Sequence, residues 1–376
     1  MAWRKVIVAL GLALVSEAAA QDYPADAPGW ELDGNAIRVE TLDGRAVIAG
    51  DNGSASRKDV RFEDGTIEFD VRLTRRRSFV YLKFRMQDER EHEEIYLRPH
   101  KSGLPDAIQY APVYQGQSAW QLHHGPGATA SPEFASGSWT HVRVVLRGRQ
   151  AAVFLGDAKA PALSVPRLAR EPKPGFVAFR VFVPPGTPGT EPAARFANLR
   201  VRPGILEDVP QPGPPAAIDN KGVVAEWSVS EALKWAPGVI PELPPLDVLG
   251  PFRKISAQRN GLVELHRHVT MRPGERDAVT AARLTLRASK AGTRAFDLGF
   301  SDRAVVFLNG APLFDGDASY SFDEPRREGL IGFDQARLFL PLRAGDNQLL
   351  VVVLDGFGGM GLMGRFPDAE GLEIQP

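Results

Sequence analysis

The chain has 376 residues, 43% hydrophobic and 24% charged, which is ordinary globular composition and enough for two hydrophobic cores rather than one. Its formal net charge of -1 at pH 7 excludes a global positive field for nucleic acid or an anionic bilayer. The absence of cysteine excludes disulfides, thiolate zinc sites, a cysteine nucleophile and a lipid-modified cysteine.

The N-terminus has the pattern of a secretory signal peptide. Basic residues at 4–5 precede an apolar run over 6–15, and three alanines at 18–20 supply the small side chains that a signal peptidase requires. The apolar run is too short to span a bilayer comfortably, so we expect residues 1–20 to be cleaved, with no membrane insertion afterwards. The alternative is an anchor that remains uncleaved. A composition rich in Arg, Ala, Pro and Gly but poor in Lys is typical of GC-rich bacteria, which predicts a periplasmic or secreted protein.

Short alternating segments follow in the first half of the mature chain. An Asp-Gly turn between the segments 36–41 and 46–49 predicts a β-hairpin, and residues 65–73 alternate as in a half-buried strand. Further strands are expected at 139–145, 151–155, 175–182 and 194–201. Because no helical pattern interrupts them, we predict an antiparallel β-sandwich over residues 30–202.

The stretch 78–120 carries the most informative alternation. Its apolar face, Val80, Leu82, Phe84, Ile95 and Leu97, is expected to join the core. The opposite, water-facing side then carries seven polar or aromatic residues: Tyr81, Lys83, Arg85, Glu94, Tyr96, Arg98 and His100.

Prolines and glycines break this pattern over residues 203–222, which predicts an extended, semi-rigid linker. Alternating segments resume over residues 223–376, including one at 261–271 and clear strands at 282–288, 295–300, 304–308, 336–340 and 348–354. The predicted fold class is therefore all-β, with two antiparallel β-sandwich (jelly-roll) domains joined by a Pro-rich linker.

Both halves resemble known families. FVYLKFR at 79–85, SGSWTHVRVVLRGRQAAVFL at 136–155 and ARFANLRV at 194–201 carry a resemblance of residues 60–202 to the concanavalin A-like lectin/glucanase jelly rolls, including their laminin-G-like and 3-keto-disaccharide-hydrolase-like branches. SDRAVVFLNG at 301–310 and LPLRAGDNQLLVVVLD at 340–355 are similar to the galactose-binding-like jelly rolls appended to β-galactosidases. The first resemblance implies a curved sheet that faces a glycan.

The polar side of 78–120 is the candidate binding site. An arginine fork and a carboxylate can bind sugar hydroxyls, and aromatic rings can stack on the apolar side of a pyranose. The predicted site comprises Tyr81, Lys83, Arg85, Glu94, Tyr96, Arg98, His100, Gln109, Tyr110, Tyr114, Trp120, Gln121 and His123. The alternative is an exposed ion-pair ladder between Glu94 and Arg98, with the aromatic rings divided between core and rim.

No catalytic residue is assigned. Glucanases of the resembled fold place two carboxylates on one strand face, and Glu89 or Glu91 with Glu93 has such a spacing. However, Arg90 and His92 interrupt this acidic run, which favours a solvated turn.

No metal site is predicted either. His266 and His268 could chelate zinc from one strand face, but no third ligand is evident. Structural calcium remains an alternative at the acidic loop that contains Asp315, Asp317 and Asp323.

Three hypotheses for function follow. The first is an exported carbohydrate-binding protein that engages a glycan on the concave sheet of the N-terminal sandwich. The second is a glycan-active enzyme, a hydrolase or lyase, that uses Glu94 with His100 or Arg98. The third is a protein-interaction or adhesion module.

Overall fold

The computed structural model describes residues 20–204, 220–239, 241–270, 278–321, 324 and 328–376. Residues 1–19 of the expected signal peptide and 205–219 of the expected linker lie outside the described residues. No helix in the described part of the chain is both long enough and apolar enough to cross a membrane.

Residues 20–204 form a sandwich of two antiparallel sheets, each with eight strands in the described residues. The β6 sheet consists of β14 (Leu163–Val165), β13 (Gln150–Leu155), β12 (Trp139–Arg147), β6 (Gly65–Leu73), β16 (Ala194–Pro203), β4 (Arg45–Gly50) and β3 (Ile37–Leu42), with β1 (Gln21–Tyr23) beside β16. The β7 sheet consists of β10 (Gln117–Ser118), β9 (Ile108–Tyr114), β8 (Glu91–Leu97), β7 (Phe79–Asp88), β15 (Gly175–Phe182), β5 (Gly53–Phe62) and β2 (Glu31–Asp33), with β11 (Thr129–Ala130) beside β9.

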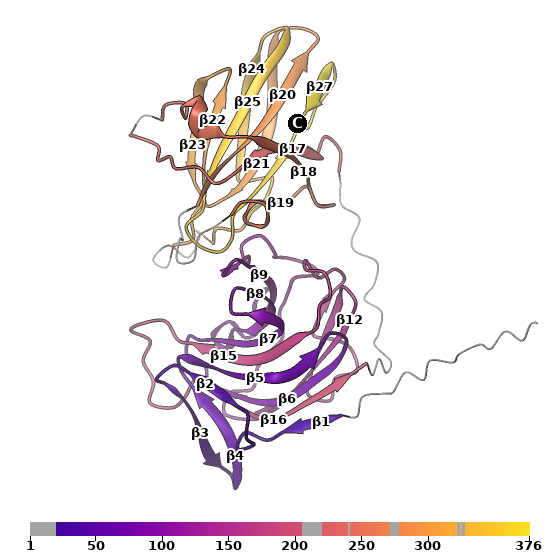
Figure 1. Cartoon of the computed structure of the whole chain (residues 1–376), viewed down its shortest axis with the longest axis vertical. Helices are drawn as coiled ribbons and strands as arrows, with labels where there is room; N and C mark the ends of the chain where they lie inside the picture. The colour runs from indigo at the N-terminus through magenta and orange to yellow at the C-terminus, as the bar shows by residue number, and fades with distance from the viewer. Residues whose placement is uncertain (1–19, 205–219, 240, 271–277, 322–323, 325–327) are drawn as a thin grey trace, which may run out of the picture.

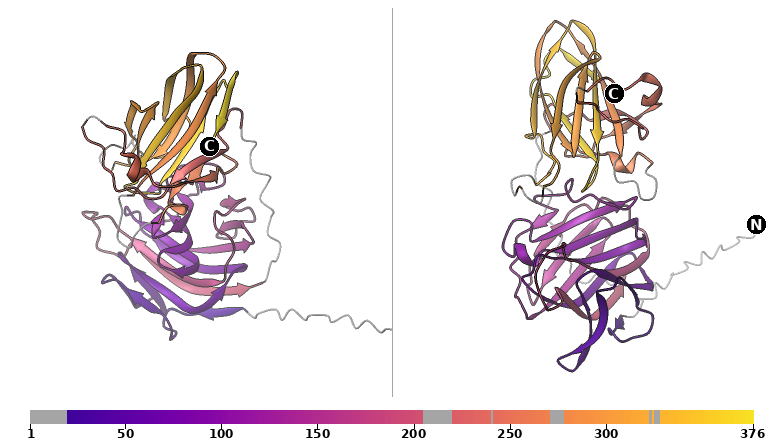
Figure 2. Two further views of the ribbon diagram at one scale, coloured as in Figure 1. Left: turned by 45° about the horizontal axis from the view of Figure 1, so that its top comes forward. Right: turned by 90° about the vertical axis from the view of Figure 1, so that its left-hand side faces the viewer.

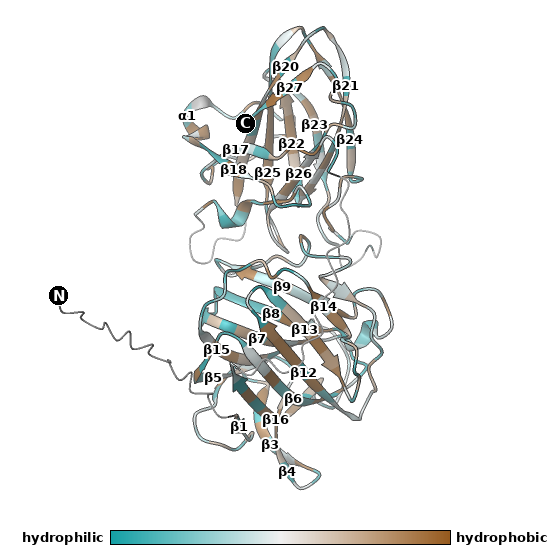
Figure 3. Cartoon of the chain, turned by 90° about the vertical axis from the view of Figure 1, so that its right-hand side faces the viewer, coloured by the Kyte–Doolittle hydropathy of each residue, from teal (hydrophilic) through white to brown (hydrophobic). Residues whose placement is uncertain are grey.

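The core of this first sandwich lies between the two sheets. The predicted apolar face is confirmed, because Val80, Leu82, Phe84, Ile95 and Leu97 all belong to one buried hydrophobic cluster. In Figure 3, β12 carries a long hydrophobic stretch, whereas hydrophilic residues are interspersed along β7 and β8. The β7 sheet therefore has one apolar face toward the core and one polar face outside.

The second sandwich follows in residues 220–376. Its larger sheet consists, in the described residues, of β18 (Phe252–Ser256), β17 (Glu226–Ser230), β20 (Val279–Ala288), β25 (Gly345–Leu354), β22 (Arg303–Leu308) and β23 (Ala311–Asp317), with β27 (Leu372–Gln375) beside β20. Its smaller sheet consists of β19 (Val263–Glu264), β26 (Gly361–Arg365), β21 (Gly292–Ser301) and β24 (Ala336–Leu342). The predicted fold class, two antiparallel β-sandwiches, is confirmed.

Helical structure is limited to single turns in the described residues, namely α1 (Leu246–Leu249) and the 3-10 turns η1 (Pro99–Lys101) and η2 (Leu265–Arg267). The strand expected at 261–271 is wrong, because in its described part only Val263–Glu264 is a strand and the turn η2 follows it directly. The strand pattern there ends at Glu264, and the turn η2 buries His266 against the Met360 carbonyl. Alternation of apolar residues over a few positions does not distinguish a strand from such a turn.

The two sandwiches are stacked along the long axis of the molecule, with β8 and β9 of the first nearest to the second (Figures 1 and 2). The segment 115–124 makes much of this contact. Its Ala119 and Leu122 lie in one buried cluster with three residues of the second sandwich, Leu262, Ile331 and Met363. A loop that follows β9 is thus fixed by hydrophobic burial in the neighbouring sandwich.

Candidate functional site

The outer face of the β7 sheet brings two predicted pairs of residues together. In the antiparallel register of β7 and β8, Tyr81 lies opposite Tyr96 and Lys83 lies opposite Glu94. The two tyrosine rings are 5.0 Å apart between centroids. Residues directly opposite in such a pair share one face of the sheet, so these four side chains form one continuous patch.

The charged half of this patch is almost fully buried. Lys83 Nζ lies 2.6 Å from Glu89 Oε2, and the side chain of Lys83 is 2% exposed against 59% for Glu89. Glu94 accepts a hydrogen bond of 2.6 Å from Ser118 Oγ. Burial opposes ionisation of Glu94, but His92, Lys83 and Ser118 outweigh it and lower the pKa of this carboxyl. Glu94 is therefore an ionised acceptor at neutral pH.

Half-buried aromatic rings continue the patch along β7 and β15. Phe182 pairs with Phe79, and the exposed Arg180 pairs with Tyr81. The rings of Phe79 and Phe182 lie 6.0 Å apart, and the Arg180 guanidinium lies 5.8 Å from the Tyr81 ring. Three residues of this surface were not predicted from the sequence: Phe79, Arg180 and Phe182. The period-two spacing of Arg180 and Phe182 in β15 was a usable signal.

Arg98 and Gln109 were expected to face water, but both side chains are buried. Arg98 Nη2 donates to the Tyr96 hydroxyl at 2.8 Å and also to Gln109 Oε1. Gln109 Nε2 in turn donates to the backbone carbonyls of Trp120 and His123, at 2.8 and 2.6 Å. These two side chains, 5% and 1% exposed, therefore hold the segment after β10 against the sheet.

His100 is also occupied by contacts within the sandwich. It lies in η1, its ring meets that of Phe79 edge-on at 5.5 Å, and its Nδ1 lies 3.4 Å from the backbone nitrogen of Ser78. Burial, with the nearby charge of Arg77, lowers the pKa of His100 to about 4, so the ring is neutral at pH 7. His100 supports the aromatic half of the patch from its edge.

Two predicted residues lie on the other side of the β7 sheet. Arg85 has φ of 50° at a register shift of β7, and its Nη1 lies 3.2 Å from the buried carboxylate of Glu93. Tyr110 is in the hydrophobic core, where its hydroxyl donates to Glu93 at 2.9 Å and accepts from the Ala169 nitrogen. The predicted outward orientation of both is wrong, in the case of Arg85 because the bulge changes the strand's parity.

Four further predicted residues contact the second sandwich. They are Tyr114, whose ring is 5.5 Å from that of His266; Trp120, next to Tyr320 and Phe357; Gln121, whose backbone nitrogen donates to Gly358; and His123, hydrogen-bonded to Glu264. The predicted site is therefore divided, because Arg85, Glu94 and Gln121 belong to separate clusters of contacts.

The carboxylates considered for catalysis are held in separate ion pairs. Glu89 approaches Lys83 on the outer face, whereas Glu93 approaches Arg85 on the core side, and Glu91 pairs with Arg170 at 2.8 Å. Glu89, in the turn between β7 and β8, and Glu93 thus lie on opposite sides of the sheet and do not form a catalytic pair. Glu91 shares the side of Glu93, but Arg170 holds it.

The metal alternatives have little support in the geometry. His266 and His268 belong to η2 and its end rather than to one strand face. Asp315 and Asp317 of the expected acidic loop lie in β23, where Arg303 donates two hydrogen bonds of 2.8 and 2.6 Å to Asp315, and Asp323 lies outside the described residues. Among the residues that are described, no group of three or more His, Cys, Asp or Glu side chains could hold a metal ion.

Fold and site together define the first half of the chain as a jelly-roll sandwich with an aromatic and charged outer sheet face. Residues 25–202 match the family model described as a 3-keto-alpha-glucoside-1,2-lyase-like domain. This match confirms the resemblance stated for residues 60–202. The similarity of the second sandwich to galactose-binding-like jelly rolls remains a prediction.

Solved structures with a similar fold cover about half of the chain. One is the carbohydrate-binding module CBM66 from Bacillus subtilis (13% identity, 46% of this chain and 94% of that chain, TM-score 0.34). Another is a β-glucanase of Bacillus licheniformis (14% identity, 49% and 97%, TM-score 0.36). A third is a lichenase derived from a mouse hindgut metagenome (11% identity, 50% and 100%, TM-score 0.37). A comparison with curated proteins found no match.

Proposed function

We propose that the first sandwich binds a carbohydrate on the outer face of its β7 sheet. The observation that supports this most directly is the combination, on one face, of half-buried rings (Phe79, Tyr81 and Phe182) with the charged pair Lys83 and Glu94. Aromatic rings stack on the apolar side of a pyranose, and an ammonium and a carboxylate bind its hydroxyl groups. The family match of residues 25–202 supports a sugar as the ligand.

The ligand has an approach to the buried charges through Glu89. This side chain is 59% exposed and forms the outer partner of Lys83, so it can move aside for a ligand whose hydroxyl oxygen then accepts a hydrogen bond from the buried ammonium. Arg180 and Tyr81 form the adjoining part of the surface. Burial, with the charge of Glu94, raises the pKa of Tyr81 well above its usual value, so its hydroxyl remains a hydrogen-bond donor. The signal-like sequence at 1–20 supports a site that meets glycans outside the cytoplasm.

Replacing Tyr81 by alanine is expected to weaken glycan binding about tenfold, because the ring supplies both a stacking surface and a hydroxyl donor. The measurement is affinity electrophoresis or calorimetry on a panel of polysaccharides and oligosaccharides. Phe339→Ala, at a ring 63% exposed in the second sandwich, is the matched control and should bind as the wild type does. Unchanged binding in both Tyr81→Ala and Glu94→Gln would exclude this face as the site.

A second candidate function is eliminative cleavage of a 3-keto-glucoside at the same patch. It is favoured by His92, which is 2% exposed, makes no hydrogen bond with the described residues and has Nε2 at 3.6 Å from Glu94 Oε2. In a 1,2-elimination, the proton on C2, acidified by the neighbouring C3 ketone, moves to a base and the C1–O bond breaks. Glu94 would accept that proton beside His92, and Lys83 would protonate the departing oxygen.

Cleavage is expected to fall at least a hundredfold in Glu94→Gln, because an amide cannot accept the C2 proton. The measurement is release of the aglycone from a 3-keto-α-glucoside, followed by mass spectrometry. Glu373→Gln, at an exposed carboxylate of the second sandwich, is the control and should keep the rate. If the wild-type protein binds the sugar but releases no aglycone, the lyase function is excluded and the binding function is kept.

A further inference from the structure

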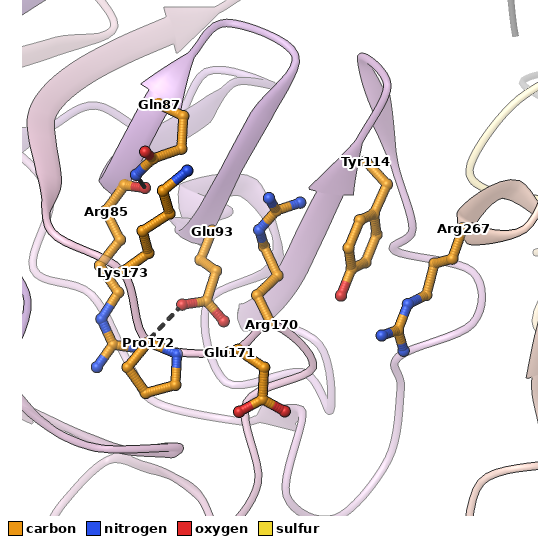
Figure 4. Close-up of a pocket in the computed structure, with 9 residues that line it drawn as sticks. All are labelled: Arg85, Gln87, Glu93, Tyr114, Arg170, Glu171, Pro172, Lys173 and Arg267. Carbon is orange, nitrogen blue, oxygen red and sulfur yellow. Dashed lines mark hydrogen bonds and ion pairs between the residues drawn. The ribbon is translucent and has the colours of Figure 1, made fainter. Parts of the chain in front are cut away.

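A separate pocket lies on the core side of the β7 sheet, next to the second sandwich (Figure 4). Its volume is about 270 Å³. It is lined by Arg85, Gln87, Glu93, Tyr114, the segment 170–173 and Arg267 of the second sandwich. Because Glu93 points away from Glu94 across the sheet, this pocket is distinct from the proposed sugar face.

Cations predominate on the lining of this pocket. Four of the lining residues are basic and two are acidic. Glu93 is already bound by Arg85 and by the Tyr110 hydroxyl, and Glu171, 78% exposed, pairs with Arg149 outside the pocket at 2.6 Å. The exposed Lys173 has no ion-pair partner in the described part of the chain. Arg85, Arg170 and Arg267 each have a carboxylate partner as well, so Lys173 is the lining cation that an anion can engage without displacing a described carboxylate.

Tyr114 offers a hydrogen-bond donor at the same place. Its ring lies between two guanidinium groups, with Arg170 4.4 Å and Arg267 4.9 Å from the ring centroid, as Figure 4 shows. The hydroxyl is buried and makes no hydrogen bond to any described residue. Burial, with the charge of Glu264, raises the pKa of Tyr114 well above its usual value, so the hydroxyl keeps its proton. A buried donor without a partner is costly, and an oxyanion would satisfy it.

We propose that this pocket binds a small organic anion, a monosaccharide-sized molecule that carries a carboxylate or a phosphate. Lys173 and Arg267 pair with the anionic group, and the Tyr114 hydroxyl donates to it. The volume lies just below the usual range of ligand pockets, roughly 300–1,000 Å³, and so fits one sugar unit rather than a chain. Because Arg267 belongs to the second sandwich, the bound anion also links the two sandwiches.

The test is calorimetry on the full chain with four probes: glucuronate, glucose 6-phosphate, inorganic phosphate and neutral glucose. We expect at least one of the anionic probes to bind and glucose not to bind at this site. Binding of glucuronate alone would assign a carboxylate, whereas binding of glucose 6-phosphate, with or without inorganic phosphate, would assign a phosphate. Either result supports the proposal.

Substitutions on the pocket lining test whether the anion binds there. Lys173→Ala is expected to weaken anion binding about tenfold and Lys173→Glu to abolish it, whereas Lys159→Ala, at an exposed lysine outside the pocket, leaves it unchanged. Arg267→Ala should weaken it as well, although this residue also pairs with Glu264. Tyr81→Ala should have no effect, which separates this site from the sugar face. The proposal is overturned if no anion binds at millimolar concentration, or if both Lys173 variants bind anions as the wild type does.

Discussion

Phe179→Ala is expected to lower the free energy of unfolding of the first sandwich by about 3–5 kcal/mol, the usual cost of truncating a buried aromatic ring. Phe179 in β15 stacks on Phe196 in β16, with the ring centroids 4.3 Å apart and the planes at 8°. It also contacts Phe69 at 5.0 Å and Trp30 at 5.9 Å. Since β15 and β16 belong to different sheets, alanine would leave a cavity where the two sheets meet.

Urea unfolding followed by circular dichroism measures this loss, and hydrogen exchange in β15 and β16 assigns it to the first sandwich. The matched control is again Phe339→Ala, whose exposed ring predicts a change within about 0.5 kcal/mol. Equal losses in the two variants would contradict the role given to the Phe179 and Phe196 stack.

Features set by neighbouring residues could be predicted from the sequence. The Asp-Gly turn predicted a hairpin, and the structure has β3 (Ile37–Leu42) paired with β4 (Arg45–Gly50) around it. Strict alternation in 78–97 predicted which side chains of β7 and β8 enter the core. Both signals depend on strand periodicity and turn chemistry, which act over a few residues.

Part of the site could not be predicted because a bulge changes which face a side chain occupies. Alternation placed Arg85 with Lys83, but the register shift after Phe84 turns it to Glu93 on the core side. A bulge inserts a residue without a distinctive sequence signal here, since Arg85 rather than glycine adopts the positive φ. For the same reason, the alternation of side chains along β7 could not predict the anion pocket, which has Arg85 on its lining.

The contact between the sandwiches accounts for the other errors. Trp120, Gln121 and His123 have the composition of a sugar site, yet their partners are residues about 140 to 240 positions away in the chain. Alternation along a strand predicts which face of its own sheet a side chain occupies. It does not predict what packs on that face. Polar and aromatic residues that suit a ligand suit an interface between sandwiches equally well.

Glu264→Gln is expected to lower the free energy of unfolding by about 3 kcal/mol at pH 7. Glu264 is 1% exposed and accepts hydrogen bonds from His123 across the interface, from Gln258 and from Arg267. Burial favours the neutral acid, but His123, with His266 and Arg267, outweighs it and lowers the pKa of this carboxyl from 4.5 to about 2. The variant keeps a hydrogen-bonding group but loses the charge.

The sign of the pH dependence follows from that lowered pKa. A carboxyl with a lower pKa in the folded state stabilises fully above its unfolded value, near 4.5, and this stability is lost as the pH falls toward 2. Urea unfolding of wild type and Glu264→Gln from pH 7 to pH 2 should therefore give two curves that differ most above pH 5 and converge below pH 3. Glu171→Gln, at an exposed carboxylate, should follow the wild type throughout. A constant difference across this range would mean that the ionised Glu264 does not hold the sandwiches together.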